Sequence, residues 1–187
     1  MFVDPAISRA KFDREIANCR KLADAYRRRG IIILSAEYPD VTVMFTAIHA
    51  KPAAMVPFAT IINFDNYDVE PPSVQFINPF SAQKLKRSEI GYDFPRLMPG
   101  QENQAVMQPL LQAFVDEKPF ICIQGVREYH QSVAHSADSW FLYRSMGPGT
   151  LGFLLDVISK YGAEPIRGAA IAVNLSVSGF AIQSIPK

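Results

Sequence analysis

The sequence predicts an α+β fold in which an N-terminal helix packs on a four-stranded antiparallel meander and further helices follow. Three observations predict it: apolar residues at helical spacing near the N-terminus, then short β-rich stretches separated by turn signals, then a later amphipathic helix. A helix followed by strands at hairpin spacing favours an antiparallel sheet covered on one face. The 187 residues suffice for one core, so we expect a single domain over residues 1–187.

The first predicted helix runs from about Ser8 to Arg29. Its apolar residues recur every three or four positions, at Phe12, Ile16, Cys19, Leu22 and Tyr26. Gly30 follows, as a residue that can end a helix in the left-handed conformation. Cys19 lies on the apolar face, which predicts a buried thiol that serves as a small hydrophobic side chain.

Four strands are predicted next. They are expected at Ile31–Glu37, Val41–Thr46, Phe58–Phe64 and Ser73–Ile77. Tyr38-Pro39-Asp40 and Lys51-Pro52 mark two turns. The loop over residues 65–72 contains the paired prolines Pro71-Pro72, which restrict the backbone between the last two strands.

The second half of the chain has weaker signals. Ser81–Gly100 is polar and rich in turn formers, which predicts a long loop. Gln101–Asp116 fits a short helix or, in part, a strand. Pro119–Val126 is apolar and expected to be extended, and Arg127–Ser139 is expected to be irregular.

Two elements are expected near the C-terminus. Thr150–Tyr161 is predicted to be a helix because its leucines and an isoleucine fall on one side and Gly162 follows. The weak alternation of Ala169–Ile182 is typical of a final strand pair, broken at Gly179.

Composition excludes several classes of function. The formal charge is +1 and the basic residues are dispersed, so nothing indicates a nucleic-acid or anionic-membrane partner. No apolar run is long enough to span a bilayer, and the N-terminus lacks a signal-peptide pattern. The two cysteines lie far apart and form no disulfide framework, so we expect a cytoplasmic protein.

Scarce reactive residue types gather in the segment 119–140, which we predict to be the functional site. Two of the three histidines and one of the two cysteines lie between Cys122 and His135, and the only tryptophan, Trp140, ends the segment. Three interpretations of this segment remain open: a metal site, a nucleophile, and a buried cysteine followed by solvated histidines.

The metal interpretation uses four residues. Cys122, Glu128, His130 and His135 supply a thiolate, a carboxylate and two imidazoles, which are ligands that tetrahedral zinc accepts. Asp138 is a fifth candidate, or a partner that orients a histidine. If Glu128 lies outside the coordination sphere, three ligands leave the open position of a catalytic zinc site. The spacing differs from that of standard zinc fingers.

The nucleophile interpretation centres on Cys122. A thiol can attack a carbonyl carbon and hold the acyl group as a thioester, with His130 or His135 as base and Glu128 orienting it. A nearby imidazolium would also raise the thiolate fraction. The competing interpretation is that Cys122, placed between two isoleucines, is only a buried strand residue.

The order of several motifs resembles the ubiquitin-conjugating enzyme fold. The motifs are a strand at Phe58–Phe64, Asn66-Tyr67, Pro71-Pro72-Ser73-Val74-Gln75-Phe76, the cysteine in Phe120-Ile121-Cys122-Ile123, and Trp140 before a helix. In that family the proline pair joins the third and fourth strands, and the cysteine carries a modifier as a thioester. The resemblance therefore implies this fold and a transferase activity on Cys122.

The sequence departs from that family at three points. The His-Pro-Asn tripeptide is missing, and we do not transfer its role to Asn78, although Asn78-Pro79 lies near that position. The stretch between the fourth strand and Cys122 is longer than in the family. Two histidines follow the cysteine, which is also unusual there.

The series Cys122, Glu128, His130 and His135 is similar to a bacterial family of predicted metal-binding proteins called CEHH. Its genes neighbour those of ubiquitin-like modifiers and their activating and conjugating enzymes. This resemblance implies a zinc-binding component of a bacterial ubiquitin-like conjugation pathway, in a setting of antiviral defence, with a modifier and an activating enzyme as partners. The alternatives are the thioester-carrying transferase and a catalytically inactive scaffold.

Overall fold

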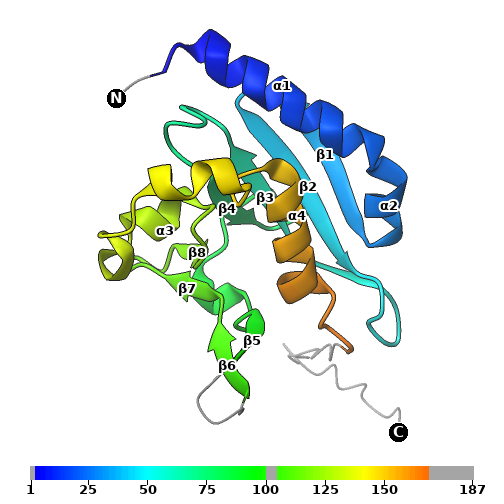
Figure 1. Cartoon of the computed structure of the whole chain (residues 1–187). Coiled ribbons are helices and arrows are strands. Elements are labelled where there is room, and N and C mark those ends of the chain that lie inside the picture. The colour runs from blue at the N-terminus through cyan, green and yellow to red at the C-terminus, as the bar shows by residue number, and fades with distance from the viewer. Residues whose placement is uncertain (1–2, 100–104, 169–187) are drawn as a thin grey trace, which may run out of the picture.

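The computed structural model describes residues 3–99 and 105–168 (Figure 1). It confirms the α+β class: an N-terminal helix, a four-stranded antiparallel sheet and later helices. In the described part of the chain, no helix is both long enough and apolar enough to cross a membrane. The predicted strand pair at Ala169–Ile182 lies outside the described residues.

The N-terminal helical region consists of α1 (Pro5–Lys21) and α2 (Ala23–Arg28), with Leu22 between them. It begins earlier than predicted because Asp4 caps α1 and a proline occupies the first turn, where its missing N–H costs nothing. Gly30 ends the region with φ +80°, as expected of a glycine that terminates a helix.

The meander has the order β1-β2-β3-β4, with every neighbouring pair antiparallel. Its strands are β1 (Ile31–Glu37), β2 (Asp40–Ala47), β3 (Met55–Asn63) and β4 (Ser73–Ile77). All four predicted strands are therefore confirmed, and two of them have the predicted ends. The alternation of buried and half-buried residues along β2 follows from the two faces of a sheet, one of which is covered.

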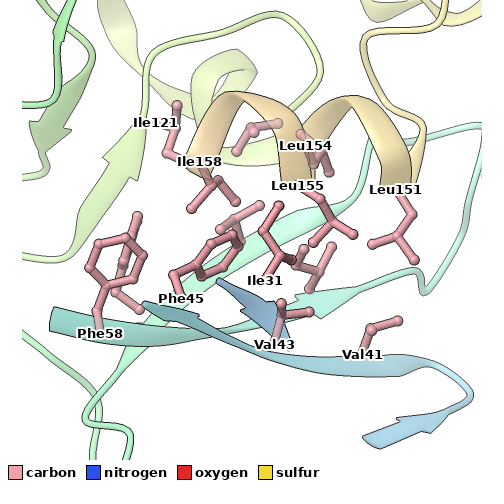
Figure 2. Packing of buried hydrophobic residues seen from close by; sticks show 14 of the residues in the cluster. Ile31, Val41, Val43, Phe45, Phe58, Ile121, Leu151, Leu154, Leu155 and Ile158 are labelled. Carbon is pink, nitrogen blue, oxygen red and sulfur yellow. The ribbon is translucent and has the colours of Figure 1, made fainter. Parts of the chain in front are cut away.

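The core lies between this sheet and the helices α1 and α4 (Leu151–Ile158). Figure 2 shows the apolar side chains of α4 above those of the sheet, and the fully buried residues that meet there are Val41, Val43, Phe45, Leu151, Leu154, Leu155 and Ile158. Thr150 caps α4. Truncating one such buried leucine to alanine typically costs about 2–5 kcal/mol of stability.

The segments between β4 and α4 differ most from the predictions. Two small antiparallel sheets form there, from β5 (Pro95–Pro99) with β6 (Ala105–Pro109) and from β7 (Leu111–Ala113) with β8 (Pro119–Ile121). The predicted loop over 81–100 thus ends in a strand, and the segment 101–116 is strand in much of its described part. Pairing partners stabilise these short strands, although their sequences show no clear alternation.

The segment 127–139 is not irregular throughout, which corrects its prediction. It contains α3 (Arg127–Gln131) and a 3₁₀ turn at Val133–His135. Elements of one turn are too short to show helical periodicity in the sequence. α3 packs against β4 and β8, on the β4 side of the sheet (Figure 1).

Candidate functional site

Cys122 directly follows β8, and hydrogen bonds fix the backbone around it. Its N–H donates to the carbonyl of Leu110 at 2.8 Å, and the N–H of Arg127 donates to the carbonyl of Pro72 at 2.8 Å. A Cβ at Gly125 would lie 1.8 Å from the carbonyl oxygen of Pro148, so only glycine permits this close crossing. The backbone thus holds the cysteine between β7, the proline pair and the start of α4.

The Cys122 thiol contacts His135. The Sγ atom lies 3.2 Å from Nε2 of the ring, within hydrogen-bonding distance, and both residues are half-buried. The thiol is therefore accessible, unlike the two isoleucines on either side of it, which are buried. The structure brings these two predicted residues together as a thiol–imidazole pair.

Tyr129 holds the ring of His135 in place. The two rings are stacked, with centroids 4.0 Å apart and an angle of 15° between their planes. The Tyr129 hydroxyl donates to the carboxylate of Asp138. Burial, and then the carboxylate, raise the pKa of Tyr129 well above its usual value, so the hydroxyl stays protonated and remains a donor. This fixed tyrosine gives the imidazole a rigid surface to stack on.

His130 has a different place. Its Nδ1 lies 2.9 Å from the carbonyl oxygen of Asp138 and its Nε2 lies 2.8 Å from that of Gln124. Carbonyl oxygens only accept hydrogen bonds, so each ring nitrogen that carries a proton is engaged with the backbone. Here His130 bridges two backbone segments, whereas His135 is the histidine that meets the thiol.

Glu128 is a structural residue in this fold. Its side chain is 1% exposed and pairs with the Lys118 ammonium at 3.2 Å. It also accepts hydrogen bonds from the Ser73 hydroxyl and from the Val74 N–H. A buried carboxylate needs such partners to remain charged. Glu128 therefore fastens α3 to β4.

The predicted four-ligand zinc site does not fit this arrangement. Within residues 3–99 and 105–168, no group of three or more histidine, cysteine or acidic side chains is placed to hold a metal ion. His130 and Glu128 use their polar atoms for protein contacts, which leaves only Cys122 and His135 at a common position. The four predicted ligands thus fall into two groups. Cys122 and His135 form a contact pair, whereas Glu128 and His130 hold the surrounding backbone in place.

The surroundings of Cys122 favour the neutral form of its thiol. Burial raises the pKa of Cys122 above its usual 9.0, although the positive charge of Arg96 opposes the increase. A protonated thiol is a weak nucleophile and needs a base to accept its proton as it attacks. The Nε2 atom of His135 lies where such a base is required.

The loop between β3 and β4 accepts hydrogen bonds from residues on both sides of His135 in the sequence. The Trp140 indole donates to the carbonyl of Asp68 at 2.9 Å, and the Arg127 side chain donates to the carbonyl of Pro71 at 3.2 Å. Asn78, by contrast, uses its side-chain oxygen to accept two N–H groups of its own turn. It thus has a local structural role, consistent with leaving the family's asparagine function untransferred.

Sequence reasoning missed Tyr129, which stands six positions before its stacking partner. A short helix and a 3₁₀ turn separate the two residues, so no simple spacing predicts the contact. Asp138 was foreseen as a partner that orients a histidine. Its carbonyl contacts His130. Its carboxylate accepts the hydrogen bond from the Tyr129 hydroxyl, and the Tyr129 ring stacks on His135.

Two comparisons with known proteins place the chain among relatives. A family model described as the Y4jH family matches residues 3–166, which include the Cys122–His135 pair. A protein of Sinorhizobium fredii (strain NBRC 101917 / NGR234), described as uncharacterized protein y4jH, is 38% identical over 200 residues. That alignment covers 99% of this chain and 97% of the relative. Neither description states a reaction or a ligand.

Proposed function

The chain belongs to the Y4jH family, whose description names no reaction, and from its site we propose that it is a thiol-dependent acyl carrier. In this proposal Cys122 accepts the C-terminal carboxyl group of a ubiquitin-like modifier from an activating enzyme and passes it to an amine. The setting would be a bacterial conjugation pathway in the cytoplasm, where free thiols stay reduced. The observation that carries the proposal is the 3.2 Å contact between Cys122 Sγ and His135 Nε2.

The transfer requires two steps. The Cys122 sulfur attacks the carbonyl carbon of the incoming thioester while its proton moves to Nε2 of His135, and the imidazolium then gives this proton to the donor sulfur, which leaves as a thiol. A new thioester then joins the acyl group to Cys122. In the second step an amine attacks the same carbon, His135 accepts the proton that the amine loses and gives it to Sγ, and the bond between the carbon and Sγ breaks.

The surroundings of the pair support this chemistry. Stacking on Tyr129 limits the rotation of His135, so that the ring remains directed at the sulfur. Cys122 is half-buried, so part of this residue is exposed, whereas Cys19 is buried. The order of the meander, the proline pair and the tryptophan before α4 gives further support, because the same order carries the resemblance to ubiquitin-conjugating enzymes.

The zinc-binding function has less support, because two of its four predicted ligands are engaged elsewhere. It stays a prediction that metal analysis tests directly: a zinc protein would hold about one equivalent of zinc after purification, and His130→Ala would lose it. A chain without bound zinc that still accepts acyl groups on Cys122 would favour the carrier function over the metal function.

The experiment uses a peptide thioester of a small thiol as acyl donor. The wild-type protein should gain the mass of the peptide through a bond that hydroxylamine cleaves. Cys122→Ser should gain it slowly, as an ester that resists thiols, and Cys122→Ala should gain none. Cys19→Ala is the matched control, since it removes the buried cysteine, and it should behave as wild type.

The same variants are then supplied with the modifier and activating enzyme of the host. Capture on Cys122 would extend the proposal from acyl chemistry to modifier transfer. A Cys122→Ala protein that retains full activity in the pathway would contradict the carrier function and favour the scaffold.

A further inference from the structure

A cleft of about 570 Å³ lies beside the segment that follows Cys122. Ile123 and Gln124, the two residues after Cys122, form part of its wall. Arg96 of β5, Leu110 and Arg29 line it as well. The remaining wall comes from α4, from the π-helix Ser159–Ala163, which includes Lys160, and from Glu164. A ligand in this cleft would therefore reach the backbone that carries the reactive sulfur.

The charges that line the cleft are unevenly matched. Asp156 and Glu164 both pair with Arg29, so these three side chains together leave one negative charge. Arg96 and Lys160 form no ion pair with any described residue. The balance of the cleft is positive, which favours an anionic ligand.

Arg96 has hydrogen-bonding capacity left over. One of its terminal nitrogens donates to the Gln108 side chain at 2.7 Å. Its Nε is buried and has no hydrogen-bond partner among the described residues. A buried donor without an acceptor is costly, so an oxygen ligand that reaches it is favoured. The guanidinium fork suits a carboxylate, which can accept two parallel hydrogen bonds.

We infer that this cleft binds a substrate carboxylate, with Arg96 as the anchoring residue and Lys160 as a second, weaker cation. The inference rests on the proposed acyl-carrier function, and it adds a substrate class: a peptide thioester that also carries a free carboxylate, which Arg96 would hold while the thioester carbonyl lies at Cys122. The same guanidinium would then be close to the carbonyl oxygen that becomes negative as sulfur attacks. The effect of Arg96 on the pKa of Cys122 agrees with this proximity.

The test compares two alkylating reagents that differ only in charge. Iodoacetate carries a carboxylate, whereas iodoacetamide is neutral, and both react when the thiolate attacks the methylene carbon and iodide leaves. The ratio of the two rates at Cys122 cancels changes in thiolate fraction, which act on both reagents alike. Peptide mapping by mass spectrometry follows each rate at Cys122 alone.

We expect Arg96→Gln to lower the iodoacetate-to-iodoacetamide ratio about tenfold, the size of one charge-assisted hydrogen bond. Lys160→Gln should lower it about threefold, as for an exposed ion pair. Arg96→Lys should keep part of the preference for iodoacetate, because the positive charge remains. This variant separates the loss of charge from a failure to fold. Arg28→Gln, which removes a charge from the exposed end of α2, is the matched control and should leave the ratio unchanged.

Competition identifies the anion. Sodium acetate should slow iodoacetate more than iodoacetamide, whereas sodium chloride at equal ionic strength should slow both equally. Selective protection by phosphate and not by acetate would overturn the carboxylate assignment, and an equal ratio in wild type and Arg96→Gln would overturn the cleft. Neither result would contradict the proposed acyl-carrier function, because the test of that function is the iodoacetamide rate and acyl capture at Cys122.

Discussion

The two cysteines of this chain lie in opposite kinds of surroundings. Cys19 of α1 is 2% exposed in the core, and burial together with the charge of Glu15 raises its pKa from 9.0 to about 11. Cys122 is half-buried, has the imidazole of His135 at 3.2 Å and lies near the charge of Arg96. Burial raises the pKa of both thiols, so the pKa alone does not separate them. The two thiols differ in their exposure to solvent and in the presence of a proton acceptor, which Cys122 has in His135.

The largest expected effect is the difference in labelling between the two thiols. In the folded protein, iodoacetamide should modify Cys122 at least about 100-fold faster than Cys19, because Cys19 reacts only when the core opens. Mass spectrometry of the two cysteine peptides measures both rates, and denatured protein provides the control, in which the rates should become similar. Equal rates in the folded protein would remove the contrast on which this comparison depends.

The second prediction concerns the stability of the core around Cys19. A folded-state pKa above the unfolded value means that folding favours the neutral thiol, so the contribution is present below pH 9 and is lost as the pH rises toward 11. The loss should reach about 2 kcal/mol in wild type and be smaller in Cys19→Ala. Urea unfolding at a series of pH values measures it, and Cys122→Ala, which removes the less buried thiol, should change the profile less than Cys19→Ala does.

The third prediction isolates the proton acceptor. His135→Gln should slow acyl capture at Cys122 about tenfold at neutral pH, because the thiol loses its base, and hydroxide should recover the rate as the pH rises. The matched control is His49→Gln, since His49 lies in the turn after β2. An unchanged rate in His135→Gln together with a slow His130→Gln would assign the base to the other histidine.

The smallest expected effect belongs to Tyr129→Phe. The substitution removes the hydroxyl that donates to Asp138 but keeps the ring stacked on His135, so acyl capture should fall about threefold. Tyr129→Ala should reduce it further, since stacking is lost as well. A phenylalanine variant as slow as the alanine variant would show that the hydroxyl, and not the ring, holds the imidazole.

Strong local signals account for the parts of the fold that could be predicted. The alternation of apolar residues and the proline-containing turns predicted β1–β4, and the helical spacing of apolar residues predicted α4. The short helix α3 and the strand β5 were not predicted, because they depend on tertiary contacts and not on periodicity. The single 22-residue helix was also too simple, since Leu22 separates α1 from α2.

The site could be predicted in part. The scarcity of cysteine and histidine pointed to the segment of Cys122 and His135, which the fold joins. The grouping of Glu128 and His130 with them came from residue type alone. Whether a carboxylate or an imidazole faces a ligand or a backbone group depends on the neighbours that folding supplies, here Lys118 for the glutamate and two carbonyl oxygens for the histidine.

The loop between β3 and β4 has a mechanical consequence for the thiol. Carbonyl groups of this loop receive the Trp140 indole and the backbone N–H of Arg127, which lie on either side of the segment with His135. Hydrogen bonds thus join the loop to both ends of the segment that contains His135. The position of the imidazole relative to the sulfur therefore depends on the conformation of this loop as well as on the stacking with Tyr129.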